Sequence, residues 1–129
     1  MTTFNEGRHA TEGLIWEENS SYSREVITIA AGSGIVAPGA VLGKYTSGAE
    51  AGKYSLAPAT AADPDVGNQT AVAIALYGCD ATSADQQIVA IVREAIWNRN
   101  TLSYHSSVDQ AGEKTTKMSQ LAAAGIVCR

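Results

Sequence analysis

The chain has 129 residues, of which nine are basic and thirteen acidic, so its formal net charge at pH 7 is −4. A chain of this length folds most simply as one domain, and it lacks the basic surplus that nucleic-acid binding requires. No apolar run is long enough to cross a membrane, and the acidic start does not have the basic and apolar regions of a signal peptide, so we expect synthesis in the cytoplasm.

Large apolar side chains are few in this sequence. Although 45% of the residues are hydrophobic, 22 of the residues are alanine, and Val, Ile, Leu and Phe together number only 25. The net charge is too small to favour disorder, so we expect a folded domain with a thin core. Such a domain can bury further apolar surface against a partner or against copies of itself.

Residues 1–20 form a polar, acidic segment without sustained periodicity. This segment nevertheless contains Phe4 and the apolar cluster Leu14, Ile15 and Trp16. Two interpretations remain open, namely a flexible arm that carries apolar anchors for a partner, or a terminus whose aromatic side chains fold back on the core.

The segment 24–30 alternates apolar and polar residues and ends at Gly-Ser-Gly, which predicts a strand followed by a turn. The next segment, 39–54, contains Gly, three residues and Gly-Lys-Tyr twice. A phosphate-binding loop needs four intervening residues and a closing Ser or Thr, so we expect no nucleotide cofactor here. Instead, Gly48 and Gly52 permit the positive φ of a loop between strands at 40–46 and 53–57.

A proline-containing loop follows, and then two apolar runs at 70–79 and 86–97. Their continuous Val, Ile and Ala content predicts strands that are buried on both faces. A further short strand is expected at 101–104. Trp97 is expected to anchor the core or an interface.

Helical spacing is found only near the end of the chain. The residues that would share one helix face are Ala111, Thr115, Met118, Leu121 and Ala122.

Asp109 is a plausible cap for this helix, and Gly125 can take the left-handed position after it. A terminal strand is expected at 126–128. The fold class predicted is therefore mainly β, with one C-terminal α-helix, a flexible N-terminal arm at 1–20 and a β-rich domain at 21–129.

No set of residues indicates catalysis or metal binding. The two histidines, His9 and His105, are far apart in sequence and accompany no known nucleophile motif. Asp63 and Asp65 could bind calcium, but the later ligands of a calcium loop are missing, so a solvated turn is favoured. We therefore expect no enzyme activity, no metal and no other cofactor.

The two cysteines, Cys79 and Cys128, show no metal-ligand spacing and lie in apolar runs. We expect both to be buried thiols. A disulfide is the alternative, which cytoplasmic synthesis disfavours.

Taken together, the segments between about Ser23 and Arg129 resemble the head decoration protein D family of lambda-like tailed bacteriophages. The resemblance lies in the order and spacing of these segments: "SREVITIAAGSG", "APGAVLGKYT", "GKYSLAPA", "TAVAIALYGCDAT", "QQIVAIVREAIWN" and "SQLAAAGIVCR". It implies a small domain of the β-clip type. It also implies a structural protein whose homotrimers bind the outer surface of the expanded capsid at three-fold positions and stabilise it against the pressure of packaged DNA.

The resemblance further implies a location on the virion, the major capsid protein as partner, and capsid contact through the N-terminal region. Within that region we propose Phe4, Leu14, Ile15 and Trp16 as contact residues, from their chemistry and position alone. Two alternatives remain, a small β-barrel ligand-binding module and a small hydrolase. The first requires a concave pocket with convergent polar groups, and the second requires His105 beside a Ser or Cys and a carboxylate.

Overall fold

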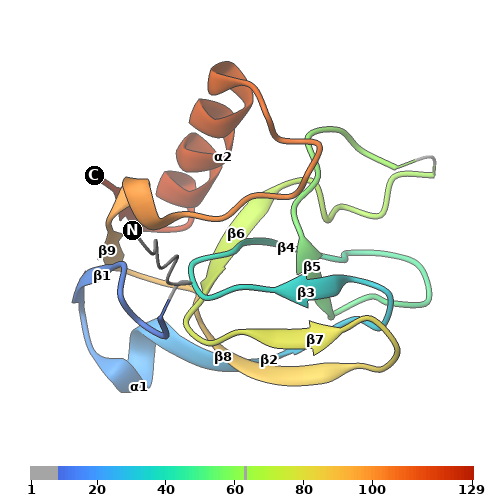
Figure 1. The fold of residues 1–129 in the computed structure, drawn as a ribbon, viewed down its shortest axis with the longest axis horizontal. Helices are drawn as coiled ribbons and strands as arrows, with labels where there is room; N and C mark the ends of the chain where they lie inside the picture. Colours follow the sequence, from blue (N-terminus) through green and yellow to red (C-terminus); the bar gives the residue numbers. More distant parts are fainter. Residues whose placement is uncertain (1–8, 63) are drawn as a thin grey trace, which may run out of the picture.

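Strands make up 35% of the chain and helical segments 17% in the computed structural model (Figure 1), which describes residues 9–62 and 64–129. The mainly β fold class with one main C-terminal helix is thus confirmed, whereas the β-clip assignment stays a prediction. The elements in chain order are β1 (Leu14–Glu17), α1 (Ser20–Ser23), β2 (Arg24–Ile29), β3 (Gly34–Val36), β4 (Val41–Lys44), β5 (Tyr54–Leu56), β6 (Ala71–Ala75), β7 (Cys79–Ala81), β8 (Gln86–Ile91), β9 (Ala95–Trp97), the 3-10 helix η1 (Arg99–Thr101), α2 (Ala111–Ala123) and β10 (Ile126–Cys128).

Five of the strands close into a barrel in the order β2, β5, β4, β6 and β8. The longest ladder joins β2 to β8 in antiparallel fashion, from Arg24 opposite Ile91 to Ile29 opposite Gln86. The barrel closes where β2 meets β5 in a single parallel pair, Ile29 with Tyr54. Strands β3 and β7 form a separate two-stranded sheet.

Five of the eleven buried residues in the apolar cluster of the barrel interior are alanine. A five-stranded barrel encloses little space, so small side chains suit its interior. The buried residues of this first cluster are Ile27, Ile29, Val36, Ala40, Leu42, Tyr54, Ala73, Ala75, Ala81, Ile88 and Ala90. Part of the alanine content that makes the core thin by composition is therefore packed here, beside larger Ile, Val, Leu and Tyr side chains.

A second apolar cluster lies between the outside of the barrel, helix α2 and the three-stranded sheet β1-β9-β10. Its buried residues are Val41, Ala57, Ala71, Ile74, Leu76, Ile91, Ala95, Trp97, Leu102, Leu121 and Ile126. Trp97 is only 1% exposed, which confirms its predicted role as a core anchor. Gly13 packs against the Trp97 indole so closely that a Cβ atom at position 13 would overlap it.

The hairpin predicted around the Gly-Lys-Tyr repeat is confirmed. Strand β4 pairs with β5 in antiparallel register, and both loop glycines have positive φ, 82° at Gly48 and 89° at Gly52. Lys53, from the second repeat, has its ammonium 2.8 Å from Glu50 and 2.8 Å from Asp85. This lysine therefore ties the hairpin to the loop that precedes β8.

The two long apolar runs are divided in the structure, contrary to the prediction of one strand each. The first run divides into β6 and the start of β7, with a bend between them that exposes Tyr77. The second run divides into β8 and β9, and residues 92–94 separate them. Glu94 has a φ of 23°, which turns the chain sharply between them. The strand predicted at 101–104 is wrong, because only Ser103 forms an isolated bridge there, with Ala40.

The cap of helix α2 lies one residue later than predicted. Gln110, rather than Asp109, is the cap residue, and its N–H donates to the Glu113 carboxylate at 3.1 Å. Gly125, with φ of 89°, ends the helix as predicted. Of the face predicted from the sequence, Leu121 is buried and Met118 is half-buried against the second cluster. The other three residues of that face are exposed, and Lys117, which was not part of it, is buried.

Both cysteines are free thiols, as predicted. The prediction that they are fully buried is wrong, because both Cys79 and Cys128 are half-buried. Burial raises the pKa of the Cys128 thiol to about 11, so it is protonated near neutral pH.

Lys117 is 2% exposed, and its ammonium donates to the main-chain carbonyl of Gln69. Burial lowers the pKa of Lys117, and this effect outweighs the opposing attraction of Glu113. The buried ammonium ties α2 to the segment that leads into β6, at the cost of removing a charge from water.

We predict that Lys117→Met changes how stability depends on pH. The lowered pKa means that the unfolded chain binds more protons than the folded chain between that pKa and the ordinary lysine value, so the free energy of unfolding rises with pH in this window. The variant lacks this rise. Urea unfolding from about pH 7 to about pH 10 should show the wild type gaining stability relative to the variant. Lys114→Met, which changes a less buried position on the same helix, should retain the rise, and a constant difference between wild type and K117M would contradict the prediction.

We predict opposite effects for two glycine substitutions. Gly13→Ala should destabilise the fold by about 1–3 kcal/mol, because the new methyl group overlaps Trp97 and Thr101. Gly112→Ala, inside α2, meets no atom within 4 Å and should stabilise the fold by about 0.5–1 kcal/mol. Denaturant titrations measure both changes, and a neutral G13A would show that β1 is not held by this contact.

Candidate functional site

Strand β1 belongs to the folded body and carries three of the four residues predicted to contact a partner. It lies antiparallel to β9 at one edge of the β1-β9-β10 sheet. Leu14 is opposite Trp97, is half-buried and packs against the second cluster. The register shifts between Leu14 and Trp16, which makes a bulge at Ile15. Phe4, the fourth predicted residue, lies outside the described residues.

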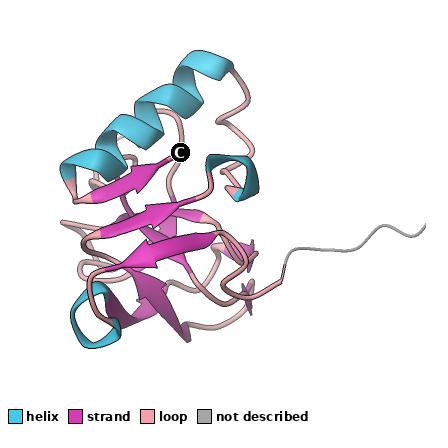
Figure 2. Cartoon of the chain, turned by 90° about the vertical axis from the view of Figure 1, so that its left-hand side faces the viewer, coloured by secondary structure: helices cyan, strands magenta, loops and turns pink. Residues whose placement is uncertain are grey.

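The outer side of this sheet carries a row of apolar side chains. Trp16 is opposite Ile96, and Ile96 is opposite Val127, so the three side chains lie in one row across the strands. Trp16 is 47% exposed and Val127 is 41% exposed, whereas Ile96 between them is half-buried. The bulged Ile15 is 59% exposed. Figure 2 shows the three strands stacked toward the viewer below α2. We call this row, together with Ile15 and the charged residues at its two ends that are described next, the outer sheet face.

The two ends of the outer sheet face carry opposite charges. At one end Glu18 donates its N–H to the carbonyl of Glu94 at 3.1 Å, and both residues are exposed. At the other end the N–H of Arg99 donates to the carbonyl of Arg129 at 2.8 Å, and both are again exposed. Glu12 precedes β1 at this second end.

Lys114 lies near the second end and adds to its positive charge. It lines a hollow of about 440 Å³ together with Arg99, and its ammonium is 5.6 Å from the centre of the Tyr104 ring. Lys114 thus adds a third basic side chain at the second end, where Glu12 is acidic.

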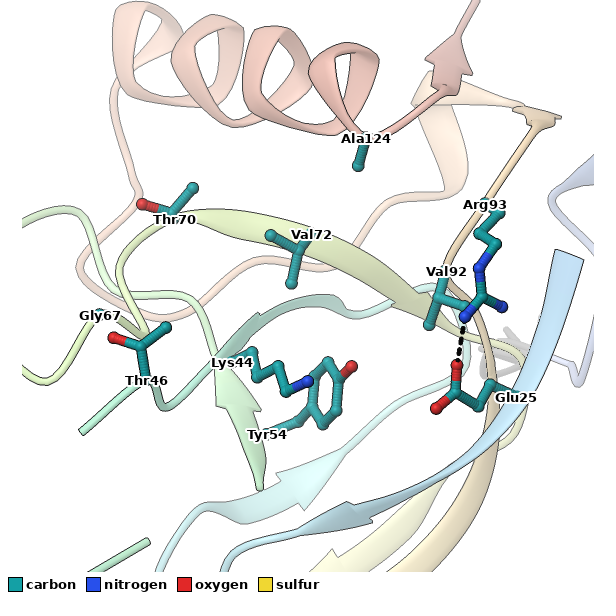
Figure 3. Close-up of a pocket in the computed structure, with 10 residues that line it drawn as sticks. All are labelled: Glu25, Lys44, Thr46, Tyr54, Gly67, Thr70, Val72, Val92, Arg93 and Ala124. Carbon is teal, nitrogen blue, oxygen red and sulfur yellow. Dashed lines mark hydrogen bonds and ion pairs between the residues drawn. The ribbon is translucent and has the colours of Figure 1, made fainter. Parts of the chain in front are cut away.

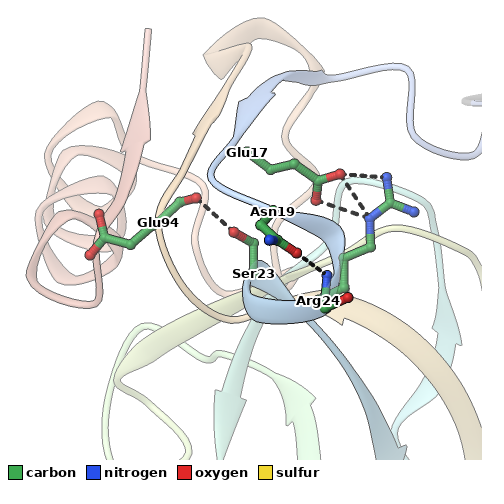
Figure 4. Close-up of polar contacts among 6 residues, drawn as sticks. Glu17, Asn19, Ser23, Arg24 and Glu94 are labelled. Atoms are coloured by element: carbon green, nitrogen blue, oxygen red, sulfur yellow. Dashed lines mark hydrogen bonds and ion pairs between the residues drawn. The ribbon is translucent and has the colours of Figure 1, made fainter.

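Strand β1 is fixed to the barrel by a group of polar contacts around α1 (Figure 4). The Arg24 guanidinium donates to both oxygens of Glu17, at 3.0 Å and 2.9 Å for the closest contacts, and this hydrogen bonding raises the pKa of Arg24. Asn19 caps α1 by accepting the N–H of Ser21 at 2.8 Å. The buried Ser23 donates its hydroxyl to the Glu94 carbonyl at 2.9 Å and so holds the sharp turn before β9. The outer sheet face is therefore presented on a fixed support.

A hollow of about 560 Å³ lies at the mouth of the barrel (Figure 3). Its size suits a small ligand. Its charged groups are already engaged, because Arg93 lies 2.9 Å from Glu25 and the Lys44 ammonium lies 5.7 Å from the centre of the Tyr54 ring. The hollow is large enough for the ligand-binding module that the sequence left as an alternative. Its charged groups, however, contact one another and do not converge on a ligand position.

His105 lies beside a serine, which is half of what the hydrolase alternative requires. Its Nδ1 is 2.8 Å from the Ser107 hydroxyl and also accepts the Ser107 N–H at 3.0 Å. The same hydroxyl accepts the Ala59 N–H at 2.9 Å, so the group braces two loops. Within the described residues no carboxylate contacts His105, so the group that would orient a catalytic imidazole is not among its contacts.

Sequence reasoning missed part of the outer sheet face. It proposed Ile15 and Trp16, which the structure places together, but not Ile96 or Val127, which lie far along the chain. In residues 9–62 and 64–129 no group of three or more metal-binding side chains comes together. No helix in the same ranges is both long enough and apolar enough to cross a membrane.

A search of curated proteins finds no related protein. The family model of bacteriophage lambda head decoration protein D, however, matches residues 3–126, nearly the whole chain, and this range includes every element from β1 to α2 and the first residue of β10. This family consists of structural proteins of the phage capsid. The chain therefore belongs to the bacteriophage lambda head decoration protein D family, and its role is the decoration of a phage head.

Proposed function

We propose that the chain forms homotrimers that bind the outer surface of the expanded phage head at its three-fold positions. There the trimers would contact the major capsid protein and stabilise the shell against the pressure of packaged DNA. The protein would be made in the host cytoplasm and added to the head afterwards. Family membership supports the decoration role, and the thin core supports burial of further surface between copies.

The observation that carries this proposal is the exposure of Ile15 and Trp16 on a strand that is fixed to the body. In the proposal, Phe4, Ile15 and Trp16 touch the capsid, and Leu14 holds β1 in place through its contact with the second cluster. Burial of one large apolar side chain contributes about 1.5–3 kcal/mol. Three copies in one trimer would act together through their effective concentration, so modest contacts add up to tight binding.

The first prediction concerns assembly. In sedimentation equilibrium at micromolar concentration the free protein should have a mass of three times 13.4 kDa. A monomer under these conditions would show that the free protein is not a trimer. A dimer would contradict the three-fold assignment.

The second prediction concerns shell binding. Deletion of residues 2–8, and separately the double substitution Ile15→Ser with Trp16→Ser, should each greatly weaken addition to undecorated expanded shells, because each removes apolar contact surface. Negative-stain microscopy and co-sedimentation with shells measure the loss. The matched control is Ile35→Ser, which changes the most exposed large apolar side chain of the β3-β7 sheet and should leave binding unchanged. Variants that decorate shells as the wild type does would contradict the assigned contact residues.

A further inference from the structure

A second exposed apolar surface lies on the barrel, outside the outer sheet face. It is a hollow of about 400 Å³ beside the β2-β8 ladder, and we call it the β2-β8 hollow. Val26 is opposite Val89 in the ladder and is 63% exposed, and Tyr77 is 43% exposed. The full lining is Val26, Tyr77, Gly78, Gln87, Ile88 and Val89, and none of these six residues carries a charge at neutral pH. The hollow is therefore suited to an uncharged, apolar side chain.

The chain enters the folded body next to this hollow. Residues 10–13 form a turn, and within it Thr11 donates its N–H to the Leu76 carbonyl at 3.0 Å. Leu76 directly precedes Tyr77, which lines the hollow. Residues 1–8 therefore join the described part of the chain beside the β2-β8 hollow.

Phe4 is within reach of the hollow. It is the only phenylalanine of the chain and lies five residues before His9. An extended chain spans at most about 3.3–3.6 Å per residue, so five residues reach roughly 17 Å. This reach is enough for a hollow that begins one residue after Leu76. The other three apolar residues proposed as capsid contacts belong to β1, which is held at the edge of its sheet.

We propose that Phe4 of the same chain occupies the β2-β8 hollow in the free protein and leaves it when the trimer binds a shell. This inference rests on the proposed function, in which Phe4 touches the capsid. A ring that is buried in the hollow is not available to the shell, so the hollow competes with the capsid for the same side chain. The contact is therefore autoinhibitory, because the apparent affinity for the shell is reduced by the fraction of chains in which the ring is released.

The point of entry favours the protein's own segment over a second copy as the occupant. The segment is tethered beside the hollow, so its effective concentration there is high. A second copy would have to bring a complementary surface, and the lining residues offer no charge that would orient it. Burial of the ring also removes an apolar group from water before assembly.

Occupancy of the hollow is tested first in the free protein, without shells. Phe4→Ser removes the ring, and a bound aromatic ring shifts the NMR signals of nearby methyl groups. In spectra of methyl-labelled protein, the signals of Val26 and Val89 should therefore differ between the wild type and F4S. The methyl signals of Ile35 and Val127, which lie outside the hollow, are the controls and should stay in place.

Competition with the shell is tested by Val26→Thr. Threonine keeps the branched shape and the strand preference but places a hydroxyl group in the hollow. Because the weakened contact releases the segment, the Kd for purified expanded shells should fall by at least about twofold. This direction is opposite to that expected for a residue that touches the capsid. The matched control is Ile35→Thr, a similar change at an exposed position of β3, which should leave the Kd unchanged.

The outcomes separate this inference from the function beneath it. Identical Val26 and Val89 signals in the wild type and F4S would overturn the inference, and so would a shift of Val127 alone. A V26T variant whose Kd rises or stays the same, or which becomes monomeric in sedimentation, would also overturn it, while the proposed function stands. If the wild type itself does not add to shells, the proposed function fails, and the methyl comparison still decides whether Phe4 occupies the hollow.

Discussion

Burial of the Trp97 indole determines where the N-terminal strand lies. A tryptophan side chain buries a large apolar area, and the chain has to surround it to exclude water. Gly13 covers one side of the indole by packing directly against it, and the Gly13 carbonyl accepts the N–H of Asn98 at 2.7 Å. On the other side, the N–H of Arg129 donates to the Trp97 carbonyl at 2.9 Å. Both ends of the described body are therefore held at β9, and the outer sheet face exists because of this arrangement.

Local signals in the sequence predict the parts of the fold that depend on a few neighbouring residues. The hairpin could be predicted because glycine at positions 48 and 52 allows the positive φ of its loop, and the end of α2 because Gly125 does the same. The division between β8 and β9 could not be predicted, because its turn is at Glu94 and no glycine or asparagine marks it. The hydroxyl of Ser23, 71 positions away in sequence, stabilises that turn.

The candidate site was predictable only in part, for the same reason. Ile15 and Trp16 are adjacent, so an apolar cluster in a polar segment is visible in the sequence. Ile96 and Val127 belong to runs that look like buried strands, and only the pairing of β9 with β1 and β10 brings their exposed sides into the same row. The burial of Lys117 also has no local signal, since its position depends on the approach of α2 to the segment before β6.

The closed barrel also determines how the molecule responds to mechanical load. Because its interior is closely packed, a stretching force passes to the main-chain ladders that join the strands. These ladders are unequal. Strand β2 is paired with β8 along its whole length, but it meets β5 only where Ile29 lies opposite Tyr54. A force that pulls the barrel open therefore separates β2 from β5 first, while the β2-β8 ladder stays intact and acts as the hinge.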